Sequence, residues 1–149
     1  MKSVLTAAFA ALLAATIVSP SSSLRAAPLD EQAGIVKVTI TYTGKGKVDS
    51  THRLWVWLFD TPNIGPAAQP IAQLSLDKNG ADAVFDGVAG DKVYVAAAFD
   101  EQGVMQGDAP PPAGSPIGVL AAADGMPVPV TPGPKGLAKL AFDDTNRMP

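Results

Sequence analysis

The sequence contains no cysteine among its 149 residues and a single histidine, His52. Disulfides, thiolate metal sites and thiol nucleophiles are therefore excluded. Catalysis by His52 would need a nucleophile and an orienting acid beside it. The sequence has neither a G-x-S-x-G nucleophile elbow nor a glycine-rich phosphate loop that opens a helix. We therefore assign no catalytic residue and predict that the protein is not an enzyme.

Charge is also sparse, because charged residues make up 17% of the chain and leave a net charge of −3. The basic residues are scattered and are not interleaved with aromatic side chains, so we expect neither nucleic acid nor an anionic membrane as a partner. Copper coordination would have to combine His52 with thioethers, and only Met105, Met126 and Met148 follow the N-terminal segment.

Only one long apolar run occurs, Leu5–Val18, and it follows Met1-Lys2. The run is shorter than the roughly 20 residues that a membrane-spanning helix needs, and its flanks are typical of a secretory signal peptide. We predict that residues 1–27 are removed, with cleavage between Ser21 and Ala27. No cysteine follows the run, so a lipid anchor is excluded. We expect a secreted or periplasmic protein without a membrane anchor.

The rest of the chain shows the patterns of β-strands and tight turns, with no amphipathic helix. Eight of the 14 prolines lie between Pro110 and Pro134, which also disfavours helices there. We predict an all-β fold, a single Greek-key β-sandwich of about seven strands in two antiparallel layers over residues 34–144, with a flexible lead at 28–33 and a polar tail at 145–149. The segments with strand patterns are Ile35–Tyr42, Leu54–Phe59, Leu74–Leu76, Ala83–Phe85, Val93–Phe99, Ile117–Ala122, Met126–Val130 and Leu137–Phe142.

The turn Asn79-Gly80 lies between two apolar runs, Leu74–Leu76 and Ala83–Phe85. Both turn residues tolerate positive φ, as a two-residue type I′ turn requires, so the pattern predicts a β-hairpin. In the strand that follows, Val93–Phe99, bulky residues alternate with a face that carries alanines. Such a strand is typical of a sandwich, and its small residues would also let another segment approach closely.

The same stretch resembles the core of transthyretin-like and carboxypeptidase-regulatory-like domains, which repeat an Asp–Gly turn, a short strand ending in Phe, a Gly-marked turn and a Tyr-Val-Ala strand. This resemblance implies a seven-stranded Greek-key sandwich that serves as an accessory, adhesion or binding module, because a fold alone assigns no activity. The matching residues are Leu76-Asp77-Lys78-Asn79-Gly80, Ala83-Val84-Phe85, Gly87-Val88-Ala89-Gly90 and Val93-Tyr94-Val95-Ala96-Ala97.

One catalytic branch of that superfamily, the transthyretin-related hydroxyisourate hydrolases, uses several histidines and a Tyr-Arg-Gly-Ser ending. This chain has only His52 and ends Asn146-Arg147-Met148-Pro149. The resemblance therefore does not carry the hydrolase activity to this chain.

The strand Leu54–Phe59 is apolar on both faces, as expected of a central strand. Trp55 and Trp57 are two residues apart and so point to the same side. They either pack in the core or form a ligand platform, for example a surface on which a sugar stacks.

Two irregular segments rich in proline and glycine, Thr61–Pro70 and Glu101–Pro116, are the expected recognition loops. Our leading hypothesis is a non-enzymatic binding module that recognises a protein or a saccharide through them, with no cofactor. The alternative is a metal-binding module. Asp100, Glu101 and Asp108 would bind calcium if backbone carbonyls completed the ligand set, and a second cluster of side-chain oxygens comprises Asp77, Asn79 and Asp82.

Overall fold

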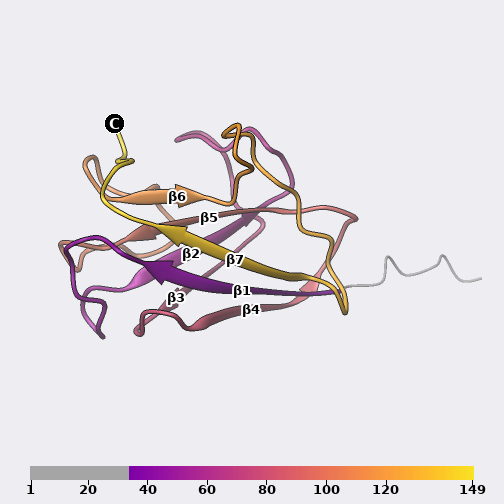
Figure 1. The fold of residues 1–149 in the computed structure, drawn as a ribbon, viewed down its shortest axis with the longest axis horizontal. Helices are drawn as coiled ribbons and strands as arrows, with labels where there is room; N and C mark the ends of the chain where they lie inside the picture. The colour runs from indigo at the N-terminus through magenta and orange to yellow at the C-terminus, as the bar shows by residue number, and fades with distance from the viewer. Residues whose placement is uncertain (1–33) are drawn as a thin grey trace, which may run out of the picture.

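The computed structural model describes residues 34–149, so the predicted signal peptide (1–27) and lead (28–33) lie outside the described residues. Seven strands and no helix occur in the described part, arranged as two sheets (Figure 1). The strands are β1 (Gly34–Tyr42), β2 (Leu54–Phe59), β3 (Ala72–Leu76), β4 (Asp82–Val88), β5 (Tyr94–Phe99), β6 (Ile117–Val119) and β7 (Leu137–Phe142). The prediction of an all-β, sandwich-like fold is confirmed.

The small sheet has the strand order β4-β1-β7 and the large sheet the order β3-β2-β5-β6. Every second residue of β1 is buried, because one face of this strand packs toward the large sheet. Val36, Val38 and Ile40 of β1 share one buried cluster with Leu54 and Val56 of β2. No helix of the described residues has the length and apolar character to cross a membrane.

The small sheet corrects the expectation of purely antiparallel layers. β1 pairs antiparallel with β4 but parallel with β7, where Lys37 is in register with Leu137 and Tyr42 with Phe142. Parallel neighbours need a crossover connection. Here the chain between β1 and β7 forms the remaining strands of the sandwich, β2 to β6. The first and last strands therefore lie side by side.

The prediction of a β-hairpin at Asn79-Gly80 is wrong. β3 pairs only with β2 and β4 pairs only with β1, so the turn carries the chain from the large sheet to the small one. Gly80 has φ of 77°, as the turn chemistry requires. The side chain of Asn79 extends the β1 ladder: its Oδ1 accepts a 2.8 Å bond from the Tyr42 amide, and its Nδ2 donates a 2.6 Å bond to the Tyr42 carbonyl.

The predicted edge strand Met126–Val130 forms only isolated bridges, Val93 with Val130 and Ala121 with Pro127. Pro127 and Pro129 have no amide hydrogen to donate, so a continuous ladder cannot form. The predicted strand at Ile117–Ala122 is correspondingly short and ends at Val119.

Residues 145–149 are not a free tail. The Met148 amide donates to the Ser115 carbonyl and the Gly114 amide donates to the Met148 carbonyl, both at 2.9 Å. Arg147 forms a β-bridge with Pro116. This last segment therefore lies beside the end of loop 101–116.

Candidate functional site

The two tryptophans lie on the outer face of the large sheet, which confirms that they point to the same side. Their rings are stacked, with centroids 6.4 Å apart and an interplanar angle of 22°. In the neighbouring strand, Ala98 is in register with Trp55 and Ala96 with Trp57. These small residues leave room for the indoles to lie over β5. The tryptophans thus belong to a second apolar cluster, outside the core between the sheets.

Loop 101–116 lies directly on this tryptophan pair. The Trp57 Nε1 donates a 3.0 Å hydrogen bond to the carbonyl oxygen of Gly107. Gly107 has φ of 79°, and a Cβ atom at this position would overlap the ring of Trp55. Only glycine satisfies both conditions, so Gly107 sets how closely the loop approaches the sheet. The indole nitrogen of Trp55 is buried and has no hydrogen-bond partner among the described residues.

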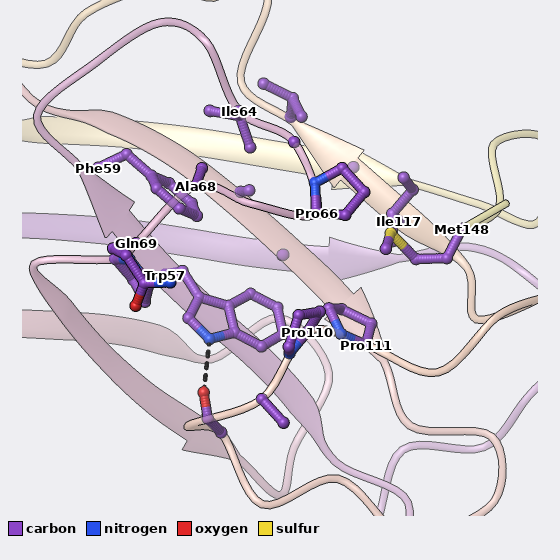
Figure 2. A pocket seen from close by; sticks show the side chains of 18 of the residues that line it. Trp57, Phe59, Ile64, Pro66, Ala68, Gln69, Pro110, Pro111, Ile117 and Met148 are labelled. Atoms are coloured by element: carbon purple, nitrogen blue, oxygen red, sulfur yellow. Dashed lines mark hydrogen bonds between the residues drawn. The ribbon is translucent and has the colours of Figure 1, made fainter.

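Between loop 61–70 and loop 101–116 lies a groove of about 280 Å³ (Figure 2). Trp57 and Phe59 of β2 lie at its floor, with Ile64 and Ala68 on one side and Pro110 and Ile117 on the other. Its lining is mostly apolar, and within residues 34–149 Asp108 is the only lining residue with a charged side chain. Concave apolar sites with few polar groups are typical of ligand-binding pockets.

The two interpretations of the tryptophans can be compared with this geometry. Trp57 is only 5% exposed and its N–H is bonded to Gly107, so its ring packs against the sheet and forms part of the groove floor. Trp55 is half-buried and is not part of the groove lining. The two rings therefore do not form an open, exposed ledge.

The three residues expected to bind calcium have separate roles in the structure. Asp100 is 3% exposed, and its two carboxylate oxygens accept the amides of Val104 and Met105 at 3.1 and 2.9 Å, which fixes the start of loop 101–116. Glu101 forms a 2.9 Å ion pair with Arg147, and Asp108 lies at the groove. Within residues 34–149 no group of three or more His, Asp or Glu side chains is placed to hold a metal.

The side chains of the second cluster, Asp77, Asn79 and Asp82, likewise make separate contacts. Asp82 accepts a hydrogen bond from Thr39 at 2.6 Å and forms a 2.7 Å ion pair with Lys37. The contact with Lys37, followed by the hydrogen bond from Thr39, lowers the pKa of Asp82. Asn79 is bonded to Tyr42, as described above, and Asp77 is exposed.

His52 lies in a turn outside the groove. Its Nδ1 is 3.1 Å from Asp49 Oδ1, which also accepts the amides of Thr51 and His52. These amide bonds lower the pKa of Asp49. The methionines considered as copper ligands occupy three different places: Met105 packs on the tryptophan cluster, Met126 is 64% exposed and Met148 lines the groove.

Sequence reasoning missed the contributions of Phe59, Ala68 and Gly107 to this site. Phe59 belongs to the same strand pattern as the tryptophans and could have been added to their face from its spacing. Gly107 gave no separate signal, because its role depends on where loop 101–116 crosses the sheet.

Comparison of the chain with protein-family models, with curated proteins and with solved structures finds no match.

Proposed function

We propose that this chain is an exported, non-enzymatic binding module that holds an apolar side chain of a protein partner in the groove between loop 61–70 and loop 101–116. The observation that carries the proposal is the groove itself, a mostly apolar cavity of about 280 Å³ on the large sheet, flanked by the two loops that the sequence pattern marked for recognition. Export is supported by the signal-peptide pattern of residues 1–27.

A protein partner fits this groove better than a saccharide does. A sugar stacks on an exposed aromatic face and needs hydrogen-bonding groups around it, whereas Trp57 is 5% exposed and its N–H is bonded to Gly107. The groove has about twice the volume of a 150 Å³ cavity that accommodates benzene. It therefore has room for one or two apolar side chains, which act as anchors in protein interfaces.

We further propose that the sandwich is a Greek-key domain of the transthyretin-like or carboxypeptidase-regulatory-like type. Seven strands in two sheets and the Asn79-Gly80 turn are in accord with it. An accessory module of this type can bind a partner through its loops, although the fold alone assigns no function.

Two variants of loop 61–70 form a matched test. Ala68 lines the groove, whereas Ala67 is exposed beside it and does not. Ala68→Phe places a ring in the groove, and Ala67→Phe adds the same ring outside it. We would select binders of the purified domain from a displayed random-peptide library and probe the same protein on a glycan array.

The proposal expects enrichment of peptides with an aromatic or aliphatic anchor. Their affinity should fall at least tenfold in Ala68→Phe and stay unchanged in Ala67→Phe. Amide NMR spectra would establish that both variants are folded. Binding of glycans but not peptides, or peptide binding that Ala68→Phe leaves intact, would refute a protein-binding groove.

A further inference from the structure

We propose that the groove selects an apolar anchor that stands next to a lysine or arginine in the partner, and that Asp108 recognises this neighbouring cation. The inference rests on the proposed function, because it names the chemistry of the ligand for the same site. It starts from charge: among the described residues, Asp108 is the only one with a charged side chain that lines this mostly apolar groove.

The backbone that carries Asp108 is held at the groove by the residue before it. Gly107 accepts the hydrogen bond from Trp57 and lies against the ring of Trp55. The Asp108 amide also donates a 3.0 Å bond to the Gln106 carbonyl, which makes a tight turn at this point. The backbone of Asp108 therefore has a defined place beside the indole of Trp57.

The carboxylate of Asp108 is available, unlike those of its neighbours in loop 101–116. Asp100 is occupied by two backbone amides and Glu101 by Arg147. Asp108 is exposed, and its side chain makes no hydrogen bond or ion pair within residues 34–149. A cation that arrives with an apolar anchor would thus meet an exposed, unpaired carboxylate of a residue that lines the groove.

The surroundings of Asp108 favour a cation over an anion. No lysine or arginine in the described part of the chain lines the groove, and the full sequence carries a net charge of −3. An apolar wall beside a carboxylate lowers the local dielectric constant and strengthens its attraction for a cation. For an exposed pair this effect corresponds to a preference of about twofold to fivefold at low salt, which screening reduces.

Three acetylated and amidated dipeptides separate anchor from charge: phenylalanine followed by lysine, by glutamine or by glutamate. Titration of each into the ¹⁵N-labelled domain at low salt, followed by amide NMR shifts, would give their affinities. We expect the lysine peptide to bind about twofold to fivefold more tightly than the glutamine peptide, and the glutamate peptide to bind most weakly.

In Asp108→Asn the affinities for the lysine and glutamine peptides should become equal. In Asp108→Lys the glutamate peptide should bind more tightly than the lysine peptide. Asp124→Asn is the matched control, since Asp124 is an exposed acid that does not line the groove; it should leave the order unchanged. Ala68→Phe should abolish binding of all three peptides.

The outcomes distinguish this inference from the function on which it rests. Equal binding of the three peptides, with loss in Ala68→Phe, would refute recognition of a cation and leave the apolar groove supported. A lysine preference that survives Asp108→Asn would refute the role of Asp108. If none of the three peptides shifts the amide NMR signals of the groove residues, both proposals are refuted.

Discussion

The indole nitrogen of Trp57 lies 3.0 Å from the carbonyl oxygen of Gly107 and donates a hydrogen bond to it, fifty residues along the chain. This bond joins a strand of the large sheet to loop 101–116, and Gly107 is also the point where the loop touches Trp55. The wall of the groove next to Asp108 is therefore set by packing on the sheet.

The first prediction compares two glycines with nearly the same positive φ. Gly107 has φ of 79° and Gly114 has φ of 83°, but a Cβ at Gly114 meets no atom within 4 Å. Gly114→Ala should cost only the left-handed strain, about 1 kcal/mol in the free energy of unfolding. Gly107→Ala should cost more, because its methyl group must displace the loop from Trp55. Urea unfolding followed by tryptophan emission measures both, and equal costs would contradict contact between loop and indole.

The second prediction concerns the side chain that continues the β1 ladder. Asn79→Ala removes both hydrogen bonds to the Tyr42 backbone and leaves a partly buried donor and acceptor unpaired. We expect a loss of about 1 to 3 kcal/mol in the free energy of unfolding. Lys78→Ala, at the exposed neighbouring position, should change stability by less than about 0.5 kcal/mol. Similar values for the two variants would show that Asn79 acts only as a turn residue.

The third prediction is a pH dependence from the hydrogen bond that Tyr42 donates to Asp144. Burial is the main cause that raises the pKa of Tyr42, and its hydrogen bond to Asp144 raises it further. Asp144 accepts this bond and a second one from the Lys45 amide, and both lower the pKa of Asp144. The contribution of Asp144 is present above its ordinary pKa of 3.8 and is lost as the pH falls through its lowered value. That of Tyr42 is present below its ordinary pKa of 10.0 and is lost as the pH rises toward its raised value.

Urea midpoints measured from pH 2 to pH 12 would check this expectation. Tyr42→Phe should be less stable than the natural protein near pH 7 and should show a weaker decline on both limbs. Tyr94→Phe is the control, because the half-buried Tyr94 has no side-chain hydrogen bond among the described residues. A pH profile of Tyr42→Phe that runs parallel to that of the natural protein would refute the coupling.

The strands could be predicted from the sequence because their signals are local. Alternation in β1 and the apolar run of β2 mark residues that need a buried face. Pairing is not local, and Asn79-Gly80 illustrates the limit: a turn that permits positive φ serves a hairpin and a change of sheet equally well. Only the partners of β3 and β4 separate the two cases.

The candidate site was predictable in parts but not as an arrangement. Spacing placed Trp55 and Trp57 on one side of their strand, and composition marked both loops. Nothing in the sequence showed that loop 61–70 and loop 101–116 cross the same face of the same sheet. Asp100 illustrates the same limit. Its place beside glycines in the sequence suggested a metal ligand, whereas in the structure its carboxylate accepts hydrogen bonds from two backbone amides of its own loop.

The parallel pairing of β1 with β7 also bears on how the domain folds. β1 is the middle strand of the small sheet, yet one of its two partners is β7, the last of the seven described strands along the chain. A nascent chain that stops before residue 137 leaves one edge of β1 without its partner, so the small sheet can close only after Leu137–Phe142 has been synthesised. Contacts so distant in sequence place a protein among the slow two-state folders, on a timescale of milliseconds to seconds.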